Sequence, residues 1–201
     1  MSTPPRTLEF IFDFASPNAY LAYQVIPGVL ARTGATLRLS PCLLGGIFKA
    51  TGNQAPMVAF GNVKGKLAYE LLETRRFVEK HGLTRFRMNP HFPVNTLLLM
   101  RGAAAAELEG RLTPYVETVL PAIWEDGLKM DDPTVVQAVL DKAGLGDLLP
   151  KTQDEAVKAK LVANTQAAVD RGVFGIPTFF VGDEMFFGKE RLGQVEEALG
   201  G

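Results

Sequence analysis

The stretch Gly172-Val-Phe-Gly-Ile-Pro-Thr-Phe-Phe-Val181 decides how the C-terminal part of the chain folds. A loop with two glycines leads into Pro177 at the start of an apolar run. A proline there removes a ladder donor and often marks a cis bond or a special turn, although it can also simply begin a strand. Gly182-Asp183 then separates residues 177–181 from residues 184–187, a pattern typical of a β-hairpin. We expect a hairpin here and a closing helix from about Lys189.

The N-terminal part predicts a strand, a helix and a second strand. Residues 8–14 and 36–40 alternate between apolar and other side chains, and between them Ser16 and Pro17 are typical of a helix start that Gly34 ends. The two strands are expected to be parallel. The Ser16 hydroxyl then lies at the carboxyl end of a strand and at the positive end of a helix, a place that favours anions, unless Ser16 serves only as a helix cap.

The middle of the chain is predicted to be helical. Residues 44–63 are rich in glycine with little periodicity, so we expect a functional loop with ligand contacts there. Helical spacing follows over residues 64–82, 94–108, 113–124, 133–143 and 154–171. The fold class is therefore α/β, with residues 1–63 and 165–201 forming one domain and residues 64–164 an inserted all-helical subdomain.

Composition excludes several classes of protein. The formal charge of the 201 residues is 21 − 22 = −1, too balanced to hold nucleic acid by bulk electrostatics. No apolar stretch approaches the roughly 18 residues needed to span a membrane, and the first dozen residues lack a signal-peptide pattern, so we expect a cytoplasmic protein. One cysteine and two histidines predict neither an internal disulfide nor a metal site. Walker, Rossmann and nucleophile-elbow motifs are absent from the sequence.

The two ends of the chain together carry a resemblance. Ser16-Pro17-x-x-Tyr20, the helical insertion, the stretch 172–181 and the block Met185-Phe-Phe-Gly-Lys-Glu-Arg-Leu192 resemble the kappa-class glutathione transferases of the thioredoxin superfamily, above all their isomerase branch. The similarity runs over nearly the whole chain, including Gly52-Asn53 and residues 93–96. It implies a thioredoxin-like fold with an inserted helical subdomain, glutathione as cofactor and a homodimer.

The resemblance also implies a glutathione site. Ser16, followed by Pro17, would contact the glutathione sulfur. Ile176 precedes Pro177, which matches the family's cis-proline, and its backbone would pair with the cysteinyl main chain of glutathione. The γ-glutamyl end would be held by Lys189 and Glu190, where many relatives have Ser-Asp or Asn-Asp instead. In the glycine-rich loop, Asn53 matches a family asparagine, and Asn62 or Lys64 would approach the glycine carboxylate.

The activity implied by the resemblance is glutathione-dependent interconversion of 2-hydroxychromene-2-carboxylate and trans-o-hydroxybenzylidenepyruvate, in the breakdown of naphthalene-type aromatics. It would proceed by reversible addition of a thiolate to a conjugated double bond. One alternative is a kappa-like transferase that conjugates electrophiles, and another is a noncatalytic binding protein on the same scaffold. Disulfide exchange is not expected, because Ser16-Pro-Asn-Ala19 contains no cysteine.

Several other residues have two interpretations. Cys42 is expected to be a small buried hydrophobe, His81 a helix C-terminal cation and His91 a surface residue. Four aromatic residues could line a substrate pocket or belong to the core: Phe12, Phe48, Phe60 and Trp124.

Overall fold

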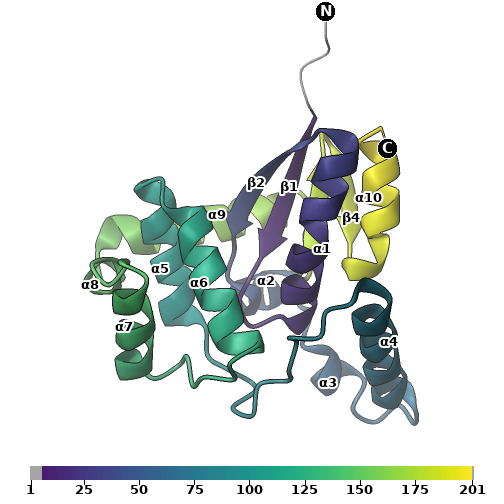
Figure 1. Cartoon of the computed structure of the whole chain (residues 1–201), viewed down its shortest axis with the longest axis horizontal. Helices are drawn as coiled ribbons and strands as arrows, with labels where there is room; N and C mark the ends of the chain where they lie inside the picture. The colour runs from purple at the N-terminus through teal and green to yellow at the C-terminus, as the bar shows by residue number, and fades with distance from the viewer. Residues whose placement is uncertain (1–5, 201) are drawn as a thin grey trace, which may run out of the picture.

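The computed structural model describes residues 6–200, which contain one mixed four-stranded sheet in the order β2-β1-β3-β4 (Figure 1). Strand β1 (Thr7–Phe12) is parallel to β2 (Thr36–Pro41) and antiparallel to β3 (Thr178–Val181), which forms a hairpin with β4 (Glu184–Phe187). The sheet therefore joins the two ends of the chain, and the predicted α/β class, parallel strands and hairpin are confirmed. Residues 1–5 and 201 of the predicted outer domain lie outside the described residues.

Helix α1 (Pro17–Thr33) begins and ends where the sequence signals predict. The Ser16 side chain accepts a hydrogen bond from the Ala19 N–H, Pro17 occupies the first helical position, and Gly34 takes the left-handed conformation at φ 68°. In Figure 1, α1 and α10 (Leu192–Ala198) lie on one face of the sheet and α9 (Glu155–Asp170) on the other. The closing helix begins later than expected, because residues 189–191 form a 3₁₀ turn, η1 (Lys189–Arg191).

The predicted helices of the middle region are present, with small shifts at their ends. The first boundary of the predicted helical subdomain falls just before α4, whereas the second, between residues 164 and 165, falls inside α9. The division into two subdomains stays a prediction. The helices are α4 (Lys66–His81), α5 (Leu97–Leu108), α6 (Leu112–Trp124), α7 (Pro133–Lys142) and α9.

The prediction of a continuous loop over residues 44–63 is wrong, since this segment contains α2 (Leu44–Thr51) and α3 (Pro56–Ala59). Glycines obscure α2 in the sequence, but Gly46 has a packing reason. A Cβ at Gly46 would lie 3.1 Å from the Thr165 Cγ2 atom, so its small size lets α2 approach α9 closely. Residues 52–55 before α3 and residues 60–65 after it remain irregular.

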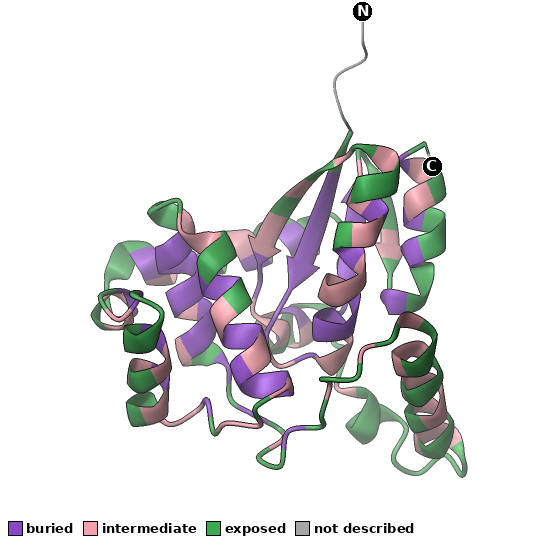
Figure 2. Ribbon diagram, in the orientation of Figure 1, coloured by how far each residue is buried: buried purple, intermediate pink, exposed green. Residues whose placement is uncertain are grey.

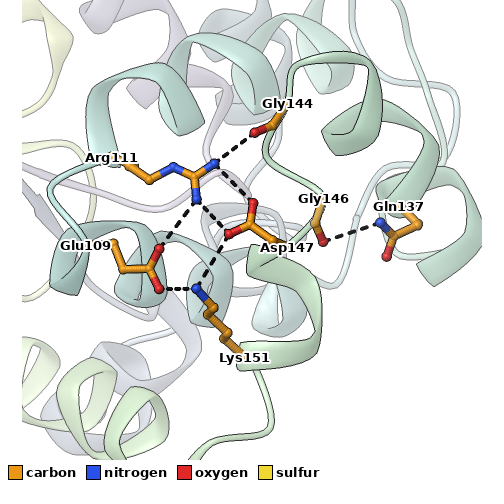
Figure 3. Close-up of polar contacts among 7 residues, drawn as sticks. All are labelled: Glu109, Arg111, Gln137, Gly144, Gly146, Asp147 and Lys151. Atoms are coloured by element: carbon orange, nitrogen blue, oxygen red, sulfur yellow. Dashed lines mark hydrogen bonds and ion pairs between the residues drawn. The ribbon is translucent and has the colours of Figure 1, made fainter.

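A short helix, α8 (Leu148–Lys151), lies between the helices predicted over residues 133–143 and 154–171, where no helix was expected. Figure 3 shows the charged cluster that fixes it. Arg111 donates two hydrogen bonds to Asp147, at 2.7 and 3.1 Å, and one to the Gly144 carbonyl at 2.8 Å, while Lys151 pairs with Glu109 and Asp147. Four residues are too few to show helical periodicity, which is why the sequence did not indicate α8.

Buried residues gather on β1 and along α1, α5 and α6 (Figure 2), and this core contains two of the four aromatic candidates. Phe12 and Trp124 are fully buried, so both belong to the core rather than to a pocket, whereas Phe48 is half-buried and Phe60 is exposed. The Trp124 indole donates a 3.0 Å hydrogen bond to the Phe14 carbonyl and so ties the end of α6 to the segment that follows β1. No helix within residues 6–200 has the length and apolar character required to cross a membrane.

Candidate functional site

Folding brings Ser16 against the Ile176-Pro177 peptide, 160 residues further along the chain. The Ser16 hydroxyl donates to the Ile176 carbonyl over 3.4 Å, and the Ile176-Pro177 bond is cis, as one interpretation of the sequence has it. Ser16 is 6% exposed and Ile176 is 8% exposed. Because 3.4 Å is long for an O–H···O hydrogen bond, the hydroxyl can turn toward a better acceptor at little cost.

The backbone around Ile176 lies just beyond the sheet. The ladder between β1 and β3 ends at the pair Ile11 and Thr178, two residues after Ile176. The Thr178 hydroxyl donates to the Gly175 carbonyl at 2.8 Å and holds the bend that leads into the strand. Ile176 thus lies just before β3, beyond the last ladder pair with β1.

Asn53 contacts the same bend from the segment after α2. Its side-chain amide donates a 2.8 Å hydrogen bond to the carbonyl of Phe174, two residues before Ile176. The Phe174 ring packs against Phe187 of β4 with 4.6 Å between ring centroids. The structure therefore brings the predicted residue Asn53 to the loop that carries Ile176. The predicted residue Pro17 lies half-buried beside Ser16.

Lys189 and Glu190 lie at the start of η1, joined to the same region by the backbone. Gly188 N–H donates to the Pro177 carbonyl at 2.9 Å, so η1 begins next to the cis-proline. Lys189 is 3% exposed, its ammonium lies 5.4 Å from the centroid of the Phe77 ring of α4, and it forms an ion pair with Glu190. The Glu190 side chain is about half exposed, so this pair presents one buried cation and one accessible carboxylate.

Asn62 is not brought together with these residues. It lies exposed between α3 and α4 on the segment that carries Lys64, and among the hydrogen bonds of residues 6–200 none joins it to the other predicted site residues. Its predicted role stays a prediction based on the resemblance.

Asp13 is a buried acid next to Ser16 that sequence reasoning did not single out. Its carboxylate accepts hydrogen bonds from Ala15 N–H, Leu44 N–H and the Thr96 hydroxyl, at 2.9, 2.7 and 2.6 Å. Burial raises the pKa of Asp13 against the lowering effect of these hydrogen bonds. The available signal was an acid at the end of an apolar strand, three residues before a helix-capping serine.

The other titratable candidates are structural. Cys42 is buried, and burial together with the charges of Glu9 and Asp13 raises the pKa of its thiol to about 12. His81 ends α4 as expected, but burial and the nearby Lys80 charge lower its pKa and so disfavour the expected cation. His91 is exposed as expected. Residues 6–200 contain no cluster of three or more side chains suited to hold a metal ion.

Comparisons with known proteins show which family and which relatives the chain resembles. A family model described as DSBA-like thioredoxin domain matches residues 7–200. The chain is 30% identical over 197 residues to a 2-hydroxychromene-2-carboxylate isomerase of Pseudomonas putida, covering 96% of this chain and 94% of that protein. It is 29% identical over 215 residues to glutathione S-transferase kappa 1 of Rattus norvegicus, covering 100% and 93%.

A solved structure shows that the similarity extends to the fold. The structure of a 2-hydroxychromene-2-carboxylate isomerase matches with a TM-score of 0.82 at 30% identity, covering 96% of this chain and 94% of that one. The match thus includes the helices between β2 and β3 as well as the sheet, and the expected thioredoxin-like fold is confirmed.

Proposed function

The chain belongs to the DSBA-like thioredoxin domain family, and we propose that it is an enzyme that isomerises 2-hydroxychromene-2-carboxylate, as the relatives that it matches over nearly their full length are named to do. The observation in the structure that carries the proposal is the Ser16 hydroxyl facing the Ile176-Pro177 peptide at the first turn of α1. This geometry brings a hydrogen-bond donor and a helix N-terminus together next to the Ile176 backbone.

These residues have the chemistry to hold glutathione, which we propose as the cofactor. A hydroxyl suits a thiolate, a backbone edge suits the cysteinyl peptide unit, and an ammonium next to a carboxylate suits the zwitterionic γ-glutamyl end. Bound glutathione would supply a thiol that can add reversibly to a conjugated carbon–carbon double bond, which becomes free to rotate while it is saturated.

Ser16 would act by stabilising negative charge on the sulfur. A free thiol has a pKa near 8.5, and a hydroxyl donor together with a helix N-terminus lowers that pKa. The Ser16 hydroxyl can exchange its 3.4 Å contact with the Ile176 carbonyl for a hydrogen bond to a thiolate, which is the stronger acceptor because it is charged. The Ser16 side chain would keep accepting from Ala19 N–H in the process.

The remaining residues would bind and orient the cofactor. The Ile176 N–H and carbonyl would pair with its cysteinyl backbone. Lys189 would hold the γ-glutamyl carboxylate and Glu190 its ammonium, so the ligand would complete an ion pair that the two side chains now make with each other. Asn53 would support the bend before Ile176 through its hydrogen bond to Phe174. Asn62 enters the proposal through the resemblance alone.

A kappa-type transferase is the second candidate, because the rat relative carries that name and a thiol-binding site serves both reactions. The two differ in product, since a transferase releases a glutathione adduct and an isomerase regenerates the thiol. The substrate of the isomerase would be a small aromatic 2-oxo acid in the breakdown of naphthalene-type compounds. The resemblance implies a homodimer, and the balanced charge and the lack of an apolar stretch of about 18 residues favour a cytoplasmic protein that binds neither nucleic acid nor membranes.

The proposal is tested by approaching equilibrium from both sides. Protein and glutathione are mixed either with 2-hydroxychromene-2-carboxylate or with trans-o-hydroxybenzylidenepyruvate, and the absorbance spectra are followed. We expect both mixtures to reach the same final spectrum, at a rate proportional to protein concentration. Final spectra that differ, or rates equal to those without protein, would refute the isomerase.

A further inference from the structure

Asp13 is the most completely buried acid near the proposed site, at 1% exposure. Its carboxylate accepts three hydrogen bonds from separate parts of the fold: from Ala15 N–H just before Ser16, from Leu44 N–H at the first residue of α2, and from the hydroxyl of Thr96, the N-cap residue of α5. One side chain therefore joins the turn before α1 to the N-termini of two other helices.

The turn that Asp13 holds is the one that presents Ser16. Ser16 N–H donates to the Asp13 carbonyl at 3.2 Å, and Ala15 N–H donates to the Asp13 side chain, so Asp13 closes the turn with its backbone and its side chain together. The N-cap residues of α2 and α5, Leu43 and Thr96, make no side-chain cap hydrogen bond, and at α5 the Asn95 side chain accepts from Leu97 N–H instead. Asp13 fills that role for α2 from outside the helix.

The three donors favour an ionised carboxylate, whereas burial acts against it and raises the pKa of Asp13. Two of the three partners are backbone N–H groups, which can only donate, and helix N-termini stabilise negative charge. An apolar residue at position 13 would avoid the cost of burying a carboxylate but would leave these donors without an acceptor.

We propose that Asp13 is a positioning residue that keeps the Ser16 hydroxyl opposite the Ile176 carbonyl by anchoring the Asp13–Ser16 turn to α2 and α5. This inference rests on the proposed function, because it assigns Asp13 an effect on the reaction through Ser16. It predicts that changes at Asp13 and Ser16 are not additive, since Asp13 has nothing to position once the hydroxyl is gone.

The test is a double-mutant cycle with Asp13→Asn and Ser16→Ala. Asparagine keeps the size and one acceptor oxygen of aspartate, but its amide group cannot accept from the donors that faced the second oxygen. We expect Asp13→Asn to lower kcat/KM about tenfold in the unaltered chain and to leave it unchanged in the Ser16→Ala background. An equal loss in both backgrounds, or no loss in either, would overturn the positioning role.

Thr96→Val keeps the test valid if Asp13→Asn does not fold. It removes one of the three donors, so a smaller loss of kcat/KM is expected, again only when Ser16 is present. Thr165→Val is the matched control: Thr165 is also buried and accepts a 3.0 Å hydrogen bond from Leu43 N–H, the neighbour of Leu44. We expect it to lower the unfolding temperature and to leave kcat/KM unchanged in both backgrounds.

Glutathione affinity, measured by calorimetry without aromatic substrate, separates this inference from the proposed function. If the unaltered chain binds glutathione but does not turn over substrate, the isomerase proposal fails and the affinity cycle still tests Asp13. If the changes at positions 13 and 16 have non-additive effects on glutathione affinity, the inference is supported. Additive losses of affinity refute it.

Discussion

Replacement of Ser16 by alanine separates a role in chemistry from a role in folding. The side chain makes two contacts in the structure, accepting from Ala19 N–H at 3.2 Å and donating to the Ile176 carbonyl at 3.4 Å. Loss of an N-cap costs about 1 kcal/mol of stability. Loss of a hydrogen bond to a charged sulfur costs about 1.5–3 kcal/mol, so we expect kcat/KM to fall about 10- to 100-fold.

The assay follows the glutathione-dependent isomerisation together with thermal unfolding. Asp132→Ala is the matched control, because Asp132 caps α7 by accepting a 2.9 Å hydrogen bond from Thr134 N–H, on the far side of the helical region from α1 (Figure 1). Both variants should lose a similar amount of stability, and only Ser16→Ala should lose activity. Unchanged kcat/KM in Ser16→Ala, or equal losses of activity in both variants, would refute the reasoning.

Three further predictions concern the cofactor contacts and the buried thiol. Lys189→Met keeps the apolar stem but removes the ammonium, so a glutathione titration should show KM raised about tenfold with little change in kcat. Asn53→Ala removes the hydrogen bond to the Phe174 carbonyl, and calorimetry should show weaker glutathione binding with a smaller change in the unfolding temperature. The raised pKa of the buried Cys42 thiol means that its contribution to the free energy of unfolding is present below pH 9 and lost as the pH rises toward 12. Denaturant titrations should therefore show that the free energy of unfolding falls over this pH range, and that it falls less in Cys42→Ala. An equal dependence of the free energy of unfolding on pH in both proteins would contradict the assignment.

Much of the fold could be predicted because its signals are local. Ser16 and Pro17 at the start of α1, Gly34 at its end, and the turn Gly182-Asp183 in the β3–β4 hairpin each determine the backbone through nearby residues. The short helices α2 and α8 could not be predicted in the same way. Gly46 is needed in α2 because α2 packs closely against α9, and α8 is held by a charged cluster between residues 109–111 and residues 144–151.

In the candidate site, too, some residues could be identified from the sequence and others depend on tertiary contacts. Ser16, Ile176 and Pro177 were identified through the resemblance, and the structure brings them together. Asp13 was missed because its partners Leu44 and Thr96 lie 31 and 83 residues away in the sequence. For His81 the sequence indicates the helix C-terminus, which favours a cation, but not the burial that lowers its pKa, because burial depends on tertiary packing.

The most direct test of the central claim is the fate of glutathione over many turnovers. Protein, trans-o-hydroxybenzylidenepyruvate and a small amount of glutathione are incubated until the amount of substrate converted exceeds the amount of glutathione many times over. The free thiol is then titrated. The account predicts conversion that requires glutathione and leaves its concentration unchanged. Conversion without glutathione, or glutathione consumed into an adduct in step with the substrate, would contradict it.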